Sequence, residues 1–303
     1  MLEAWEGTID PFLMTPTEEF RRRQTAVWKS LDEGGFDVGF VVFSDEHYCG
    51  GVPYLGGNTN ISIEQVAGLI GPAAWASFIG KELGCEDWGF KVMVGANEAN
   101  RTLIGKALNR PIRKGDWVYL EVAPTRDGLN SCIRRSVIAV ESPAQVAPEQ
   151  RYRFRFIEQA YRVGHQKYVE VARDGLPARL QEQALVDFFA SKAEEVSRGV
   201  GKPIPLAQLK FYTGTHNAGY TECQEFFGAI TLDRHEPLGH PIATMLDVAL
   251  RGFGSRWNEV IIPGFDYIVI ENTLGKYGPR VRTLTRLPLN VQRLVGNVDE
   301  LAC

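Results

Sequence analysis

Two carboxylates stand out because each interrupts an apolar run. Glu121 lies within Val118–Ala123, and Asp247 lies within Met245–Leu250. An ionisable side chain in a buried strand is costly unless it is paired, which favours a site role for Asp247. A buried Glu121 would have a raised pKa suited to acid–base chemistry, whereas on a half-exposed strand it would simply face water.

A histidine and a cysteine extend this set. His216 lies in the glycine-flanked segment 213–219, where it would serve as a base or a ligand, or would be hydrogen-bonded within a turn. Cys132 alone is typical of a small buried apolar residue. Beside an imidazole its thiol would be deprotonated more readily and become a nucleophile.

Strands, a hairpin and two long helices must position these side chains. Asp127-Gly128 is a hairpin turn signal between predicted strands at 116–123 and 132–140. Amphipathic helices are predicted over 148–173 and 178–198. Further strands are predicted over 91–95, 209–212, 243–250, 258–262, 267–272 and 280–284. Near the N-terminus the pattern predicts a helix at 16–33, a strand at 38–43 and helical structure over 61–83. This order favours an α+β fold rather than a parallel doubly wound sheet.

Composition excludes several classes of function. The chain has 303 residues, 44% hydrophobic and 23% charged, with a net charge of −4, so no nucleic-acid partner is expected. Its apolar stretches are too short to cross a bilayer, and its acidic N-terminus lacks a signal-peptide pattern. Five cysteines without regular spacing predict free thiols and a cytoplasmic protein.

Five segments resemble, in order, motifs of the creatinase/prolidase/methionine-aminopeptidase superfamily: Arg113–Glu121, Asp127–Arg135, Thr213–Tyr220, Pro241–Asp247 and Ser255–Glu259. The resemblance implies a pita-bread α+β fold, with the two long helices between the second and third motifs. Only the start of the family's N-terminal domain is recognisable. We therefore expect a vestigial N-terminal α/β region at 1–60 and a catalytic-type domain at 61–303.

The same resemblance implies five carboxylate and imidazole positions that hold two divalent metals. Matched one by one, those positions fall on Glu121, Cys132, His216, Asp247 and Asn258, with Glu259 as an alternative to Asn258. A second family histidine falls on Cys223. Because carboxylates offset the repulsion between two adjacent dications, their replacement predicts no two-metal site, no metal ligands and no cofactor.

The candidate residues fall into two groups. The catalytic candidates are His216, Glu121, Asp247 and Cys132. The substrate-binding candidates are Arg135, Arg256, Cys223, Asn258, Glu259, Tyr220 and Asn97. Either arginine would bind a substrate carboxylate through two hydrogen bonds or form a salt bridge within the fold.

These residues favour an enzyme that acts on a small polar, carboxylate-bearing or amino-acid-derived molecule without two metals. Its chemistry would be C–N hydrolysis or elimination, isomerisation or cyclisation, in a specialised biosynthetic pathway. Creatinase is a metal-free precedent in the resembled family, but its upstream histidine has no counterpart here. A mononuclear zinc or iron enzyme and an inactive pseudo-peptidase used as a binding module remain alternatives. The resemblance also implies a homodimer.

Overall fold

The computed structural model describes residues 17–35, 39–42, 67–70, 79–85, 87–97, 112–126, 129–206, 214–218, 229–252, 259–263 and 265–290. The chain divides into two compact units, Met1–Phe78 and Ile79–Cys303. Each unit is considered by itself below.

The described residues of the first unit form one helix and a pair of short strands. Helix α1 spans Thr17–Glu33, and β1 (Gly39–Val42) pairs antiparallel with β2 (Ala67–Ile70). The helix predicted over 61–83 is therefore wrong at β2. Gly68 is a poor helix former, and the ladder to β1 supplies hydrogen bonds that no local pattern reveals.

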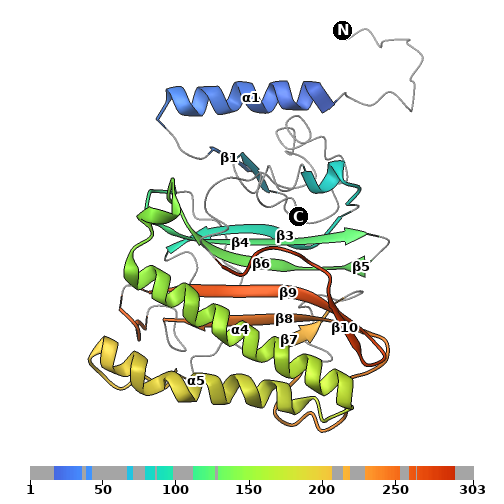
Figure 1. Cartoon of the computed structure of the whole chain (residues 1–303). Coiled ribbons are helices and arrows are strands. Elements are labelled where there is room, and N and C mark those ends of the chain that lie inside the picture. Colours follow the sequence, from blue (N-terminus) through green and yellow to red (C-terminus); the bar gives the residue numbers. More distant parts are fainter. Residues whose placement is uncertain are drawn as a thin grey trace, which may run out of the picture. The chain divides into compact units, whose positions relative to one another are not determined.

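The second unit is built on an eight-stranded antiparallel sheet (Figure 1). Neighbouring strands follow the order β3-β4-β6-β9-β8-β7, while β5 pairs with β4 and β10 with β9. The bounds are β3 Asp87–Ala96, β4 Trp117–Arg126, β5 Leu129–Asn130, β6 Ile133–Ile138, β7 Thr215–Asn217, β8 Ile242–Arg251, β9 Tyr267–Tyr277 and β10 Arg280–Thr283. The hairpin predicted around Asp127-Gly128 corresponds to β4, β5 and β6.

Two long helices cover this sheet (Figure 1). After a short 3-10 turn at Pro143–Gln145, α4 spans Pro148–Asp174 and α5 spans Arg179–Val200. Both helices end at a left-handed glycine, Gly175 with φ 62° and Gly201 with φ 78°. Helix α4 packs on β8, β9 and β10, and α5 packs on α4.

Side chains alternate between the two faces of the sheet. Leu246, Val248, Ile268 and Ile270 join the main core with residues of α4 and α5. The residues between them in sequence point to the other face, because successive side chains of a strand alternate. That second face carries the ionisable groups Asp247 and Glu271, among others described below. The predicted α+β architecture is confirmed.

The strand predicted at 258–262 is not formed by its described part. Residues 259–263 contain one bridge residue and then bend, and Ile261 and Ile262 both donate their backbone N–H to the carbonyl of Gly252. Pro263 follows at once and cannot donate to a ladder. None of the described helices is long and apolar enough to cross a membrane.

Candidate functional site

Six side chains from five strands and their edges converge on the sheet face opposite the helices. Glu121 comes from β4, Arg134 from β6, His216 from β7, Asp247 from β8 and Glu271 from β9, and Cys132 precedes β6. The strand register explains the convergence. Asp247 pairs with Glu271, and Arg134 lies between Glu121 and Glu271 on its two neighbouring strands. All six side chains are at most 4% exposed.

The guanidinium of Arg134 lies among three carboxylates. Its Nη1 donates to Oδ2 of Asp247 at 2.7 Å, and its Nη2 donates to Oε1 of Glu121 at 3.0 Å. Its Nε lies 2.8 Å from Oε2 of Glu121 and 2.7 Å from Oε2 of Glu271. A buried arginine of this kind is stable only while its carboxylate partners offset the loss of hydration.

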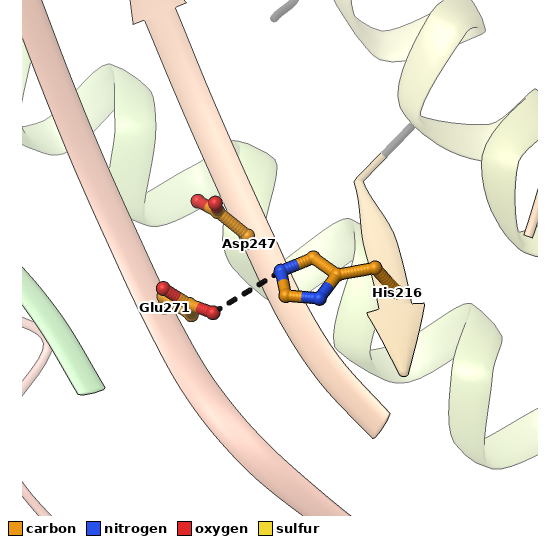
Figure 2. Close-up of side chains that lie close together, drawn as sticks. All are labelled: His216, Asp247 and Glu271. Atoms are coloured by element: carbon orange, nitrogen blue, oxygen red, sulfur yellow. Dashed lines mark ion pairs between the residues drawn. The ribbon is translucent and has the colours of Figure 1, made fainter. Parts of the chain in front are cut away.

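His216 faces the same carboxylates from the edge of the sheet (Figure 2). Figure 2 shows its ring pointing towards Glu271 and Asp247, and its Nε2 lies 3.4 Å from Oε1 of Glu271. Its Nδ1 lies 3.1 Å from the carbonyl oxygen of Asn217. Because that carbonyl can only accept, Nδ1 carries a hydrogen and Nε2 is directed at the carboxylate. A proton on Nε2 of His216 or on Oε1 of Glu271 would form a hydrogen bond between these two atoms.

Cys132 and Tyr119 add hydrogen bonds to Glu121 and Glu271. The sulfur of Cys132 lies 3.6 Å from Oε1 of Glu121 and 3.4 Å from Oε2 of Glu271, so its single hydrogen can be donated to either carboxylate. The hydroxyl of Tyr119 donates to Oε2 of Glu121. Backbone bonds fix the cysteine, since its N–H donates to Oγ1 of Thr273, which in turn donates to its carbonyl.

The environment moves the pKa values of two carboxyls in opposite directions. Burial raises the pKa of Glu121, with a further rise from the nearby charge of Glu271, and Arg134 only partly opposes this. Burial also acts to raise the pKa of Glu271, but Arg134, His216 and Cys132 together lower it below its ordinary value. Glu121 is therefore the carboxyl that keeps a proton more readily, and Glu271 is the one that stays ionised.

Glu271 and Arg134 are absent from the candidates predicted by the sequence. Both have a sequence signal. Glu271 directly follows the apolar run Tyr267–Ile270 within a predicted strand, and Arg134 shares a strand face with Cys132 two residues away. The last carboxylate position of the cluster is filled by Glu271, whereas Glu259 is exposed and does not reach it.

Arg135 is not placed to bind a substrate. It follows Arg134 in β6 and so points to the other face, where it is 3% exposed. Its guanidinium donates to the backbone carbonyls of Arg134, Glu271, Leu287 and Pro288 and to Oδ1 of Asn272, at 2.7–3.1 Å. These bonds occupy its donors, and its role is to tie the segment after β10 to the sheet.

Asn97 also has a structural partner set. It adopts a positive φ of 47°, its Nδ2 donates to Asp116 at 2.7 Å, and its Oδ1 accepts the backbone N–H of Trp117 at 2.9 Å. Both ends of the amide hold the start of β4, so Asn97 lies apart from the cluster. The other substrate-binding candidates, Arg256, Cys223, Asn258 and Tyr220, lie outside the described residues.

A family model for metallopeptidase family M24 matches residues 60–231, more than half of the chain. The chain belongs to the M24 metallopeptidase family. This agrees with the resemblance of the first three motifs, which lie within the matched residues, and with the predicted pita-bread fold, a mixed α/β fold around an antiparallel sheet. No curated protein sequence matches the chain significantly.

Several solved structures share the fold. An X-Pro aminopeptidase from Thermotoga maritima has 18% identity and a TM-score of 0.52, over 70% of this chain and 52% of that one. A prolidase from Pyrococcus furiosus has 15% identity and a TM-score of 0.54, over 91% and 66%. The N-terminal domain of FACT complex subunit SPT16 from chickpea has 10% identity and a TM-score of 0.52, over 71% and 48%. The match thus spans about half to two thirds of these longer chains, and at such identities it establishes the fold alone.

The M24 family implies metal ions, and the cluster can be tested for them by its charges. Glu121, Asp247 and Glu271 carry three negative charges at most, and Arg134 removes one, which leaves two against the four positive charges of two divalent ions. Both oxygens of Glu121, Oδ2 of Asp247 and Oε2 of Glu271 are directed at the guanidinium instead, while Oε1 of Glu271 faces His216. Two metals therefore do not fit this site with Arg134 in place. The sequence predicted the loss of two metals from replaced carboxylates, but Glu271 supplies the carboxylate that was expected to be missing at Asn258. The main obstacle to two metals is therefore the charge of Arg134.

Proposed function

We propose that this M24 chain is a metal-independent enzyme that acts on a C–N bond of a small polar, carboxylate-bearing molecule by acid–base chemistry. The observation that carries the proposal is the guanidinium of Arg134, which pairs with Glu121, Asp247 and Glu271 at 2.7–3.0 Å. A fixed cation at this place supplies positive charge without an ion.

The acid–base roles follow from the two carboxyls and the imidazole. His216 would move a proton through its Nε2. Glu271 would orient the ring, since its Oε1 lies 3.4 Å from this Nε2. Glu121, whose pKa burial raises, would act as the proton donor. Hydrolysis and elimination both require a proton to reach the leaving nitrogen, and Glu121 and His216 are the groups able to deliver it.

The test combines metal analysis with a substrate panel. Untagged protein would be analysed for metals by elemental mass spectrometry and then incubated with X-Pro dipeptides, N-substituted amino acids and ureido or guanidino acids, with and without a chelator. We expect less than about a tenth of an equivalent of metal. Turnover should survive the chelator, be lost in His216→Ala and be retained in the control His235→Ala, which alters an exposed histidine. Turnover that requires added metal would refute metal independence.

A second candidate function, a binding module without catalysis, is favoured by the burial of the cluster. Glu121, His216 and Glu271 have no exposed surface, and the charges of the cluster are paired internally. A fold relative named as a FACT complex subunit is a second consideration in its favour. The absence of turnover across the panel, together with binding of a ligand or protein that His216→Ala does not weaken, would support this function over the enzyme.

The predicted homodimer is part of the same proposal. M24 resemblance is its basis, and sedimentation equilibrium tests it directly, because a mass of twice 33.8 kDa would support it. A single-chain mass over the working concentration range would contradict it.

A further inference from the structure

Arg134 lies in the cluster where the side chains of three strands meet. Its Nη2 approaches Glu121 of β4, its Nη1 approaches Asp247 of β8, and its Nε approaches Glu271 of β9. None of these carboxylate side chains is more than 1% exposed. Arg134 lies two residues after Cys132, the residue that falls on one of the family's metal-binding positions, and both belong to the same face of the sheet.

The carboxylates around Arg134 retain the arrangement of a cation site. His216, Asp247 and Glu271 each offer one ligand atom, and these atoms lie within 4.8 Å of one another. One imidazole nitrogen and two carboxylate oxygens are ligands that zinc, cobalt and manganese accept. The cluster therefore has suitable ligands for one ion, and the cation already present is the guanidinium.

We infer that Arg134 is a built-in cation that fills the metal position of the M24 fold and excludes divalent ions, so that removing its charge opens a site for one ion between His216, Asp247 and Glu271. This deepens the proposed function, because it gives metal independence a physical cause in one residue. The contacts support it. Oδ2 of Asp247 and Oε2 of Glu271 each lie 2.7 Å from a guanidinium nitrogen. Without Arg134 the carboxyls of Glu121, Asp247 and Glu271 carry three negative charges at most, and one divalent ion offsets two of them.

The test measures Co²⁺ binding by the full chain, freed of metals, in wild type, Arg134→Met and Arg134→Lys. Binding is followed by equilibrium dialysis and by the visible absorption of Co²⁺, which reports its ligands. We expect the bound amount to rise from below about a tenth of an equivalent in wild type to about one equivalent in Arg134→Met. Arg134→Lys retains the charge and should stay close to wild type. Adding His216→Ala to Arg134→Met should abolish the gain.

A second variant covers the case in which Arg134→Met does not fold. Glu121→Gln combined with Arg134→Met removes one carboxylate together with the cation, so the buried charge is smaller and the three ligands remain. Co²⁺ should raise the melting temperature of this double variant and leave that of wild type unchanged. If both variants unfold, Co²⁺ should restore their near-ultraviolet circular dichroism, and failure to do so would overturn the inference.

The outcomes separate this inference from the proposed function. A metal-free wild type with a folded Arg134→Met that binds no Co²⁺ overturns the inference alone. A gain of Co²⁺ binding in Arg134→Met, without any His216-dependent turnover in wild type, supports the inference and refutes the enzyme. Stoichiometric metal in wild type that is lost in His216→Ala overturns both.

Discussion

A buried guanidinium that pairs with three carboxylates is stabilising only as a complete set. Each carboxylate of this set is fully enclosed, so a lost partner cannot be replaced by water. Arg134 also offers three nitrogens to oxygens on three different strands, β4, β8 and β9. At the scale of the residue, its charge and its fork-shaped geometry therefore join strands that are distant in sequence.

Truncating this arginine should be among the most damaging single changes in the chain. We expect Arg134→Met to lower the free energy of unfolding by about 3–5 kcal/mol at neutral pH with a chelator present, because three buried carboxylates lose their counter-charge. Urea unfolding followed by circular dichroism measures this. Arg162→Met is the control, since Arg162 pairs with Glu158 on an exposed helix face and should cost at most about 0.5 kcal/mol. Equal losses in the two variants would contradict the importance of the buried set.

The opposite pKa directions of the two glutamates predict opposite pH effects. The pKa of Glu121 is raised above 4.5, so its folded form resists ionisation, and stability falls as pH rises from 4.5 through the folded pKa. The pKa of Glu271 is lowered below 4.5, so its contribution is present above 4.5 and is lost as pH falls through the folded pKa.

Amide variants isolate these effects. Relative to wild type, Glu121→Gln should gain stability as pH rises above about 4.5, and Glu271→Gln should gain stability as pH falls below it. Urea unfolding between about pH 3 and pH 9 gives both differences. Difference curves with the same sign of slope would show that the two carboxyls are not shifted in opposite directions.

Which site residues could be predicted from the sequence depends on the alternation of side chains between the two faces of a strand. Glu121 and Asp247 could be selected because a charge within an apolar run needs a partner. The prediction of Arg135 as a substrate-binding residue is wrong, because adjacent strand residues point to opposite faces and it is Arg134 that shares the face of Cys132. Glu271 was recoverable by the argument already applied to Asp247. Its pairing with Asp247 depends on the β8–β9 register, which a single sequence does not define.

At the scale of the element, helix α5 positions the strand that carries His216. The side chain of Glu182 accepts the N–H of Gly214 at 3.0 Å, and Gln181 accepts the hydroxyl of Thr215 at 2.8 Å. Leu185, fully buried on the same helix, lies directly against Gly214. The three-residue strand β7 is too short to hold its own position, so these contacts fix where the imidazole lies.

A methyl group at Gly214 should disturb this contact. A Cβ there would lie 2.3 Å from Cδ1 of Leu185, which the surrounding core prevents from moving freely. We expect Gly214→Ala to destabilise the protein by about 1–3 kcal/mol and to shift the NMR signals of the His216 ring.

Gly199→Ala, on helix α5, is the matched control for Gly214→Ala. Nothing lies within 4 Å of a Cβ at Gly199, so alanine should stabilise the helix by up to about 1 kcal/mol and leave His216 unchanged. If Gly214→Ala behaved like Gly199→Ala, the helix would not be what positions β7.

Helices and strands could be predicted from the sequence where the local pattern agrees with the tertiary structure. The long helices α4 and α5 and the hairpin of β4 and β6 match the sequence pattern, because their amphipathic periods and their turn glycines are local properties. Strand β2 was not predictable, since its hydrogen bonds come from β1, which lies about 25 residues earlier in the chain. Long-range pairing also explains why β7 carries no local signal of its own.

At the scale of the whole molecule, the sequence and the structure place the boundary between the two parts of the chain at different residues. The family match begins at residue 60, close to the domain boundary predicted from sequence at 60/61. The contact-based division lies after Phe78, and it keeps β1 and β2 in one unit, whereas a cut at 60/61 would separate β2 from its partner strand. A strand without its partner exposes unpaired backbone groups that promote association.

Fragments beginning at residue 61 and at Ile79 decide between these boundaries. All strands of the eight-stranded sheet and both helices that cover it lie within 79–303, so this fragment should unfold cooperatively, with the Arg134 cluster intact. The fragment 61–303 carries β2 without β1 and should associate more strongly during size-exclusion chromatography. Introducing Arg134→Met into 79–303 should cause the same loss of about 3–5 kcal/mol as in the full chain, since its three carboxylate partners among the described residues belong to this unit. A monodisperse 61–303 that is more stable than 79–303 would instead place the boundary at 60/61 and make β2 part of the catalytic-type domain.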